Sequence, residues 1–442
     1  MDAGRNERKT GAVTDPRADT LDELQWRGLI AQSTDEVALR AALAAGPVTY
    51  YCGFDPTAPS LHIGNLVQLL TMRRLQQFGH RPLALVGGAT GLIGDPKPTS
   101  ERTLNSRDVV SGWVERIRAQ IEPFLDFEGA SAARMVDNLE WTEPLSAIDF
   151  LRDVGQHFRV NRMLAKEAVS ARLNSDVGIS YTEFSYQILQ AMDFLRLHER
   201  HGCSLQLGGS DQWGNLTAGT DLIHRVSGAP VHALATPLVT KADGTKFGKT
   251  ESGTVWLDPS MTSPYAFYQF WLNAEDAKAA EYLRVFTFRS RDEVAELEKA
   301  TAERPAAREA QRALAGDVTT LVHGERATTR VVEASQALFG RGDLAALDED
   351  TLRDALAELP RATVPAGPHP VAELLTATGL VASRSAARRA IAEGGAYLNN
   401  ERVTAEDAVV DPATALHGRW LLLRRGRRSL GAVELSGGPP RE

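Results

Sequence analysis

The sequence is poor in cysteine. Only two cysteines occur among its 442 residues, Cys52 and Cys203, and two thiols cannot build the disulfide framework that stabilises many small secreted proteins. No apolar run approaches the roughly 20 residues that a membrane span requires. The first 20 residues are polar and lack the apolar segment of a secretory signal. These absences predict a cytoplasmic protein without a membrane partner.

Positive charge is also scarce. The formal net charge is -8, which by itself disfavours contact between the whole chain and nucleic acid. The charge is unevenly distributed, however, because the segment from residue 367 onward is locally basic. Its arginines include Arg384, Arg388, Arg389, Arg419, Arg424, Arg425, Arg427 and Arg428. An acidic protein with a basic appendage is compatible with RNA binding through that appendage.

A chain of this length accommodates two or three domains, each with its own core. Strands and helices alternate in the first part, which predicts an α/β fold with a Rossmann-like, doubly wound parallel sheet. The sequence after residue 261 is rich in Ala, Glu and Arg with helical periodicity, and four prolines follow it. We expect a flexible extension (1–20), the α/β domain (21–261), an all-helical domain (262–359), a linker (360–368), a small α+β domain (369–435) and a tail (436–442).

A strand followed by a helix provides the first candidate site. Val48 to Phe54 reads as a buried strand, and a helical pattern follows with Ser60 as its expected N-cap. His62 and Gly64 then lie in the first helical turn, where free N–H groups and the positive end of the helix dipole suit phosphate. The Asn65 amide can add a hydrogen bond. A histidine that merely packs near a helix start would give the same pattern.

A second strand, Arg81 to Val86, runs into the glycine-rich segment from Gly87 to Asp95. Loops at the carboxyl ends of parallel strands bind ligands in doubly wound sheets. The segment is therefore well placed for a nucleotide. Glycines that serve only to form tight turns would give the same sequence pattern.

A loop rich in glycine and lysine, from Lys241 to Gly253, is the second candidate site. Lys246 and Lys249 lie three residues apart and are followed by Thr250. Two such lysines can close over a polyphosphate and neutralise its charge. A solvated surface loop is the alternative.

One predicted helix, from Ser180 to Arg200, carries polar groups on a half-apolar face. Tyr186, Gln190 and Asp193 follow the spacing i, i+4, i+7 and share that face. Converging hydrogen-bonding groups of this kind indicate a ligand pocket. A partly exposed polar stripe is the alternative interpretation.

Five motifs occur along the chain in the order YYCGFDPTAPSLHIGN, GATGLIGDP, YTEFSYQILQAMDF, QLGGSDQWGN and KFGKT. On these motifs the chain resembles the bacterial tyrosyl-tRNA synthetases, a family of class I aminoacyl-tRNA synthetases. The first motif is similar to the family's HIGH signature and the last to its KMSKS signature. The tail from His369 to about Leu435 resembles an S4-type RNA-binding domain through residues 383–391 and 394–399. The resemblance runs from about residue 21 to the end.

The resemblance implies a reaction and its partners. The α/β domain would be catalytic, the helical domain would bind the anticodon, and the small domain would bind RNA. L-Tyrosine would be activated with ATP, accompanied by Mg²⁺, and then transferred to tRNA(Tyr) by a homodimeric enzyme. No covalent enzyme intermediate is needed, so catalysis would rest on positioning and charge stabilisation.

The resemblance also assigns residues to roles. The catalytic set is Thr57, His62, Asn65, Arg102, Lys246, Lys249 and Thr250. The tyrosine-binding set is Tyr51, Asp95, Tyr186, Gln190, Asp193, Gln206 and Gln212. The ATP-binding set is Gly53, Asp55, His62, Gly64, Gly209, Asp211 and Lys249. The RNA-binding set is Arg384, Ser385, Arg388 and Arg389, and no metal-binding residues are expected.

Two positions depart from the family pattern. Asn65 stands where the signature has its second histidine, and an amide keeps a donor but cannot become cationic. The segment from Asp95 to Arg102 is one residue shorter than in the family. Arg102 keeps its place in the pattern, whereas Lys97 has no clear counterpart.

Two other functions fit part of the sequence. A tryptophan-specific class I ligase would share the fold, but the pair Tyr51 and Asp193 and the S4-like tail disfavour it. An RNA-binding protein built on an inactive synthetase would not need His62, Lys246 and Lys249, all of which are present.

Overall fold

The chain forms two compact units. The computed structural model describes residues 16–97, 100–174, 176, 178–245, 247–250 and 253–436, with the backbone alone at 16, 167, 168, 249 and 250. The first unit comprises Met1–Asp258 and Ala280–Ala295, and the second comprises Pro259–Ala279 and Glu296–Glu442. The boundary falls inside α12 (Asp276–Phe286) and α13 (Arg291–Glu303). The segment 262–359, expected to be one helical domain, is therefore divided between the units.

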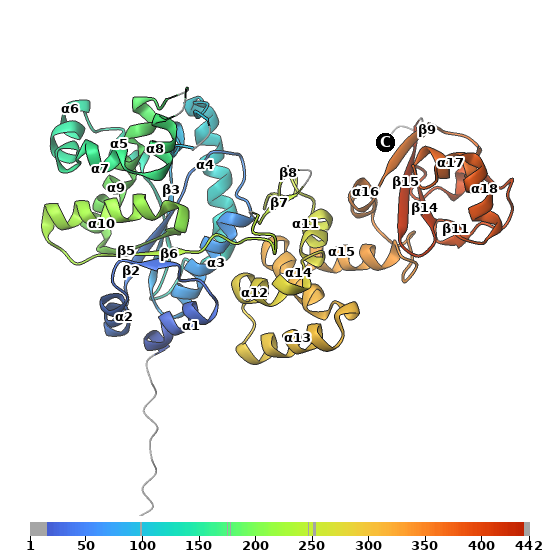
Figure 1. Ribbon diagram of the computed structural model, residues 1–442, viewed down its shortest axis with the longest axis horizontal. Helices are drawn as coiled ribbons and strands as arrows, with labels where there is room; N and C mark the ends of the chain where they lie inside the picture. The colour runs from blue at the N-terminus through green and yellow to red at the C-terminus, as the bar shows by residue number, and fades with distance from the viewer. Residues whose placement is uncertain are drawn as a thin grey trace, which may run out of the picture. The chain divides into compact units, whose positions relative to one another are not determined.

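A six-stranded sheet forms the centre of the first unit (Figure 1). Its order is β1-β6-β5-β2-β3-β4, and only β1 is antiparallel to its neighbour. The strands are β1 (Gln32–Ser33), β2 (Thr49–Phe54), β3 (Arg81–Val86), β4 (Arg134–Asp137), β5 (Cys203–Gly209) and β6 (His232–Thr236). The order reverses between β2 and β5, which is the place where doubly wound sheets bind ligands.

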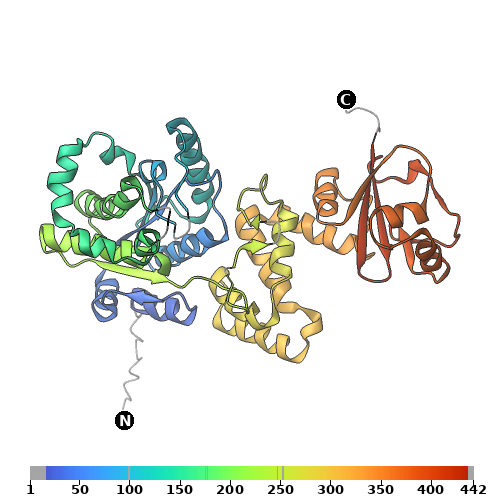
Figure 2. The ribbon, with the colours of Figure 1, turned by 45° about the horizontal axis from the view of Figure 1, so that its top comes forward.

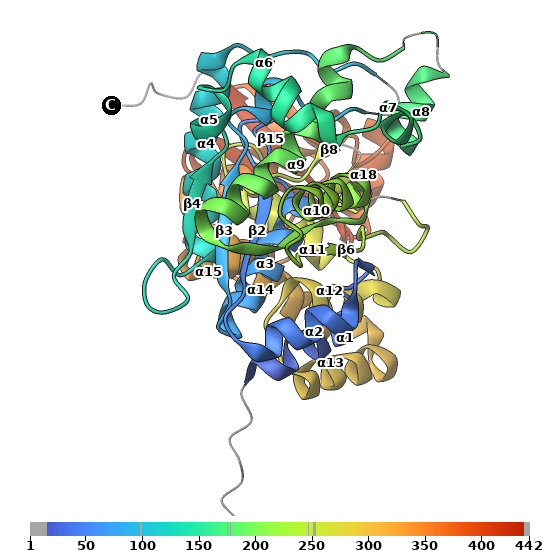
Figure 3. The same ribbon diagram turned by 90° about the vertical axis from the view of Figure 1, so that its left-hand side faces the viewer.

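Helices cover both faces of this sheet. Figures 1 and 3 show α3 (Ile63–Gln77) and α4 (Arg107–Ile121) on one face, and α9 (Tyr181–His201) and α10 (Trp213–Ser227) on the other. The shorter α-helices are α1 (Thr20–Trp26), α2 (Glu36–Ala45), α5 (Leu139–Thr142), α6 (Ala147–Asp149), α7 (Val160–Leu164) and α8 (Glu167–Leu173). None of the helices within the described residues is long and apolar enough to cross a membrane.

The apolar core beneath the ligand-binding edge joins the sheet to α9. Tyr51 of β2, Leu83 of β3 and Phe194 of α9 belong to one buried cluster, and the rings of Tyr51 and Phe194 lie 5.3 Å apart. Burial of this aliphatic and aromatic surface fixes α9 against the sheet. The polar residues of the same helix are thereby held at the strand ends.

The N-terminal extension is shorter than expected. Residues 1–15 lie outside the described part of the chain, but Pro16–Asp19 forms a 3-10 helix that leads directly into α1. Thr20 is 1% exposed and its hydroxyl donates to the Arg17 carbonyl at 2.8 Å. The prediction of a flexible segment is therefore wrong for residues 16–20, because the buried threonine ties them to α1.

The second unit is helical at first and ends in a mixed α+β part. Its helices include α11 (Pro264–Leu272), α14 (Glu309–His323), α15 (Glu325–Ala337) and α16 (Glu349–Ala357). A five-stranded sheet of order β12-β11-β14-β15-β9 follows, with α17 (Val371–Ala377) and α18 (Arg384–Ala392) packed against it (Figure 2). The strands are β9 (Arg361–Pro365), β11 (Ala396–Leu398), β12 (Glu401–Arg402), β14 (Trp420–Arg425) and β15 (Ser429–Ser436). The expected small α+β architecture is present.

The predicted linker over 360–368 is wrong for most of its length. Residues 361–365 form β9, which pairs in parallel with β15 from Ala432 to Ser436. Proline suggested a connector, yet an edge strand tolerates proline because one side of its backbone has no strand to pair with. The sheet also includes Ser436, the first residue of the expected tail, while 437–442 lie outside the described residues.

Candidate functional site

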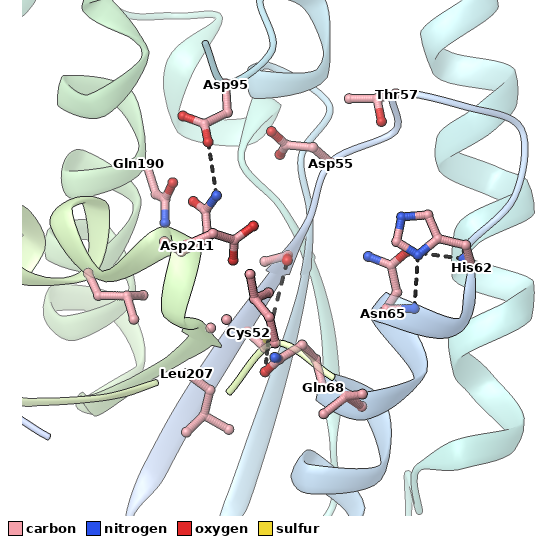
Figure 4. A pocket seen from close by; sticks show the side chains of 18 of the residues that line it. Cys52, Asp55, Thr57, His62, Asn65, Gln68, Asp95, Gln190, Leu207 and Asp211 are labelled. Atoms are coloured by element: carbon pink, nitrogen blue, oxygen red, sulfur yellow. Dashed lines mark hydrogen bonds between the residues drawn. The ribbon is translucent and has the colours of Figure 1, made fainter. Parts of the chain in front are cut away.

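A cavity of about 310 Å³ opens at the carboxyl ends of β2 and β5, where the strand order reverses. The predicted residues that line it are Tyr51, Gly53, Asp55, Thr57, His62, Gly64, Asn65, Asp95, Arg102, Tyr186, Gln190, Asp193, Gly209, Asp211 and Gln212. In Figure 4, Asp95, Gln190 and Asp211 stand on one side of the space, and His62 and Asn65 stand at the start of α3 on the other. One cavity thus unites predicted residues as far apart in the sequence as Tyr51 and Gln212.

Several predicted residues are not placed in the cavity. Gln206 is 1% exposed and does not line it; a Cβ at Gly219 of α10 would lie 3.0 Å from the Gln206 Oε1. Lys246 lies outside the described residues. Lys249 and Thr250 form β7, which pairs with β8 (Gly253–Thr254), and their side chains are not described.

The start of α3 is built by His62 and Asn65. His62 is the N-cap: its Nδ1 accepts from the Gly64 N–H at 3.0 Å, and the Asn65 Oδ1 accepts from the His62 N–H at 3.0 Å. The expectation of Ser60 as N-cap is wrong, because its hydroxyl donates to the Leu61 carbonyl at 2.7 Å instead. An acceptor at Nδ1 leaves the proton of a neutral imidazole on Nε2, which makes that nitrogen a donor.

Glycine is needed at position 64 for a steric reason. A Cβ there would lie 2.8 Å from the Cε1 of His62, closer than side-chain carbons approach one another. The imidazole can therefore fold over the backbone N–H only because residue 64 has no side chain. The group that lies close to the Gly64 backbone is the His62 imidazole.

A buried carboxylate closes one end of the cavity. Asp193 is 2% exposed; its Oδ1 accepts from Trp141 Nε1 at 2.8 Å and its Oδ2 accepts from Asn138 Nδ2 at 3.0 Å. Burial raises the pKa of Asp193 to about 7, although both hydrogen bonds oppose the rise. The carboxyl group is thus fixed in orientation and titrates near neutrality.

Two polar atoms beside Asp193 have no partner among the described residues. They are the Tyr51 hydroxyl and the Gln190 Oε1, and both are buried. Burial, followed by the Asp193 charge, raises the pKa of Tyr51 well above its usual value, so its hydroxyl stays protonated. Buried polar atoms without partners are costly. Their convergence in a cavity indicates a ligand that carries matching polar groups.

The glycine-rich segment after β3 supports a second carboxylate, Asp55. Its Oδ1 accepts from the Thr90 hydroxyl at 2.6 Å and its Oδ2 accepts from the Tyr186 hydroxyl at 2.5 Å. A Cβ at Gly87 would lie 2.2 Å from the Asp55 Oδ1. Gly87 therefore makes room for a side chain of the site. Burial raises the pKa of Asp55, opposed by its bonds to Thr90 and Tyr186.

Asp95 belongs to a third polar network. Its Oδ2 accepts from Gln212 Nε2 at 2.9 Å and its Oδ1 accepts from Asn215 Nδ2 at 3.2 Å. The Lys166 ammonium group donates to the Asn215 Oδ1. Burial lowers the pKa of Lys166 to about 8. Burial also raises the pKa of Asp95, opposed first by the bond from Gln212.

Several residues of these networks were not predicted. They are Thr90, Asn138, Trp141, Lys166 and Asn215. Asn215 lies inside the motif QLGGSDQWGN, so its place at a helix start next to Gln212 was a usable signal. Asn138 and Trp141 follow β4 in the short helix α5, and only the packing of α9 over that helix brings them to Asp193.

The predicted RNA-binding residues lie in the second unit, on α18. Arg384, Ser385, Arg388 and Arg389 are all exposed, and the Ser383 hydroxyl caps the helix by accepting from the Ala386 N–H at 3.3 Å. Arg384 pairs with Glu373 at 3.0 Å. In the adjoining sheet the Arg424 guanidinium lies 3.7 Å from the centre of the Tyr397 ring. The exposed arginines of α18 suit contact with nucleic acid.

Known proteins match this chain over nearly its whole length. The family model for tRNA synthetases class I (W and Y) matches residues 43–340. A second model, for the tyrosine–tRNA ligase SYY-like C-terminal domain, matches residues 351–431. The chain belongs to the class I tRNA synthetases.

Two similar members of this synthetase family are named tyrosine–tRNA ligases. Tyrosine–tRNA ligase from Streptomyces avermitilis is 70% identical over 421 residues, which is 95% of this chain and all of that protein. Tyrosine–tRNA ligase from Mycobacterium bovis is 59% identical over 420 residues, 94% of this chain and 99% of that protein. A C-terminally truncated mitochondrial tyrosyl-tRNA synthetase from Aspergillus nidulans matches with a TM-score of 0.66 at 28% identity, covering 72% of this chain and 94% of that chain.

Proposed function

We propose that this class I synthetase is a tyrosine–tRNA ligase. It would join L-tyrosine to ATP as tyrosyl-adenylate, release pyrophosphate, and transfer tyrosine to the 3′ end of tRNA(Tyr). The observation that carries the proposal is the cavity itself, with a buried Asp193 carboxylate at one end and a helix start at the other. Relatives at 59–70% identity are named tyrosine–tRNA ligases, which supports the same activity.

The Asp193 end of the cavity fits tyrosine. The phenolic O–H would donate to the ionised Asp193 carboxylate and accept from the Tyr51 hydroxyl, which lacks a partner among the described residues. Asp95, Tyr186 and Gln190 would surround the ammonium group. Asp193 is held by two fixed donors, so the pocket is organised before tyrosine enters.

The other end of the cavity fits ATP. The N–H groups at the start of α3, with Thr57 and His62, would hold the phosphates. Asp211 would accept from a ribose hydroxyl, and Gly209 lets its carboxylate lie close, since a Cβ at residue 209 would be 2.5 Å from the Asp211 Oδ1. The described residues contain no group of three metal-ligating side chains. We therefore assign Mg²⁺ to the phosphates of ATP rather than to a protein cage.

The proposed chemistry is a direct displacement. A carboxylate oxygen of tyrosine attacks the α-phosphorus of ATP, the bond to the bridging oxygen breaks, and pyrophosphate leaves with the electron pair. His62, Arg102, Lys246 and Lys249 would stabilise the negative charge that develops on the phosphates. A ribose hydroxyl of the tRNA 3′ end then attacks the tyrosyl carbonyl and expels AMP.

Exchange of pyrophosphate into ATP tests the activity directly. We expect tyrosine-dependent exchange, with tryptophan and phenylalanine far weaker, because only tyrosine satisfies both Asp193 and Tyr51. Exchange with tryptophan alone would support the tryptophan enzyme, which shares the fold. No exchange with any of the three would favour an RNA-binding protein without catalysis.

The finer features of the proposal concern assembly and location. The segment 148–181 carries exposed apolar side chains at Ile148, Leu151, Val160, Leu164, Leu173 and Tyr181. Several exposed apolar side chains along one segment are typical of an interaction site, and we assign them to contact with a second copy of the chain in a homodimer. We also propose that the helices of the second unit contact the anticodon, that α18 contacts tRNA, and that the enzyme works in the cytoplasm.

A further inference from the structure

A buried ion pair outside the cavity involves Arg172 of α8 and Glu183 of α9. The Arg172 Nη2 lies 3.1 Å from the Glu183 Oε2, and both side chains are almost fully buried, with 1% and 2% exposed. An ion pair so deeply buried stabilises a fold little, because desolvation offsets the attraction. Its presence therefore calls for another explanation.

Two other polar atoms of the pair bind main-chain groups of Lys97, Ser100 and Arg102. The Arg172 Nη1 donates to the carbonyls of Lys97 at 3.1 Å and Ser100 at 2.7 Å. The Glu183 Oε1 accepts from the Arg102 N–H at 2.8 Å. The pair thus holds backbone groups at three points between Lys97 and Arg102. A further bond, from Arg172 Nε to the Gly178 carbonyl at 2.8 Å, fixes the guanidinium itself.

This segment connects two residues of the cavity. Asp95 lies at its beginning and Arg102 at its end, and both line the cavity. The Arg102 Nε donates to the Asp95 carbonyl at 2.8 Å. Glu183 lies one turn before Tyr186 on α9, so the helix that carries tyrosine-binding residues also holds the backbone of Arg102. The ion pair therefore ties the arginine to the frame of the amino-acid pocket.

We propose that Arg172 and Glu183 are positioning residues for Arg102. They hold the backbone at Lys97, Ser100 and Arg102 so that the Arg102 guanidinium faces the phosphates of ATP while tyrosine is bound beside α9. Neither side chain lines the cavity, so both act through Arg102. The inference rests on the proposed function, since it needs ATP at the open end of the cavity.

A double-mutant cycle with Arg102 tests the inference. The first variant is Arg172→Met/Glu183→Leu, which removes both charges together, because loss of one partner alone would leave an uncompensated buried charge. We expect kcat/KM for ATP in pyrophosphate exchange to fall about tenfold or more, with the Kd for tyrosine within about twofold of wild type. In an Arg102→Ala background the same double replacement should change kcat/KM by less than about twofold.

Two further variants separate positioning from general destabilisation. Arg172→Met/Glu183→Gln also removes both charges, but the glutamine keeps an oxygen for the Arg102 N–H, so it should recover part of the kcat/KM lost in Arg172→Met/Glu183→Leu. Gln76→Leu is the matched control: Gln76 is also buried and donates to the carbonyls of Asp126 at 2.6 Å and Ser131 at 2.9 Å, but it does not line the cavity. It should lower the melting temperature without affecting kcat/KM for ATP.

The outcomes distinguish this inference from the proposed function. Additive losses in the cycle, an equal loss of tyrosine affinity, or an equal effect of Gln76→Leu would overturn the positioning role. Absence of tyrosine-dependent exchange in the wild-type enzyme would instead overturn the proposed function.

Discussion

At the scale of single residues, Asp193 shows how burial sets both specificity and pH response. Its carboxyl group lies among Asn138, Trp141 and the Tyr51 ring, where a charge is poorly solvated. Burial raises its pKa to about 7, whereas an exposed aspartate ionises near 4. The ionised form is the one that can accept a hydrogen bond from a phenol, so the group that we propose to bind the tyrosine hydroxyl titrates in the physiological range.

We therefore predict that tyrosine affinity falls as the pH is lowered. With a pKa of about 7, the ionised fraction of Asp193 drops as the pH is lowered from 8 to 6, and the Kd for tyrosine should rise about tenfold. Free tyrosine does not titrate in this interval. Equilibrium binding without ATP measures the effect. Asp193→Asn should bind weakly with a flat profile, and an unchanged slope in that variant would assign the titration to another group.

At the scale of elements, the start of α3 shows that one helix end serves two purposes. His62 and Asn65 satisfy each other's backbone groups in a capping box, and the remaining N–H groups and the helix dipole face the cavity. Asn65, assigned to catalysis from the motif, thus also stabilises the start of α3 by accepting from the His62 N–H. Different amino-acid substitutions at residue 65 can separate these two roles.

Replacements of Asn65 should divide stability from catalysis. Asn65→Ala loses the acceptor for the His62 N–H and should lower the free energy of unfolding by about 1 kcal/mol. Asn65→Asp keeps that acceptor and should unfold like wild type. Its negative charge beside the phosphates should raise the KM for ATP about fivefold, for roughly 1 kcal/mol of repulsion. Urea unfolding and pyrophosphate exchange measure the two effects. An aspartate variant with normal KM would remove Asn65 from the phosphate site.

At the scale of the whole molecule, the location of β9 determines where the C-terminal part can be removed. Because β9 pairs with β15, a cut inside the expected linker would leave a strand without its partner. An unpaired strand favours aggregation. The structural boundary lies before Arg361, between α16 and the sheet.

Truncation after Leu359 should therefore leave a well-behaved enzyme. We expect pyrophosphate exchange close to that of the full chain, with loss of tRNA affinity and a weaker dependence of the remaining affinity on salt, because the arginines of α18 are gone. Truncation after Gly367 should retain the chemistry but aggregate more. Light scattering, exchange and filter binding measure these properties. Unchanged tRNA affinity would contradict an RNA contact in this part.

Self-association is the second prediction at this scale. Tyr181 is 69% exposed and Ile148 is 70% exposed, so Ile148→Glu/Tyr181→Glu should convert the proposed homodimer to monomers in sedimentation experiments, because the new charges would be desolvated at the interface. Val37 is 82% exposed on α2, outside the patch, and Val37→Glu should leave the dimer intact. A monomeric wild-type chain at micromolar concentration would contradict the proposal.

The sequence by itself determined the main elements that carry the site and the chemistry of their side chains. Apolar periodicity located α9 and aligned Tyr186, Gln190 and Asp193 on one face, because the helical repeat depends only on local geometry. Pro56 and Pro59, which follow β2, end that strand before α3 begins. These features could be read directly because they arise within one turn or one strand.

Only the tertiary structure decided which distant groups meet. Asn138 and Trp141 reach Asp193, and Arg172 reaches the carbonyl of Ser100 near Arg102, through packing of residues that lie more than 50 positions apart in the sequence. Tertiary structure also decided the nature of β9. The prolines in and around this segment suggested a connector, but the segment forms a strand because it pairs with β15. Burial and pairing depend on the whole fold, and they set the pKa of Asp193 and the edge of the last sheet, whereas local pattern carries no information about either.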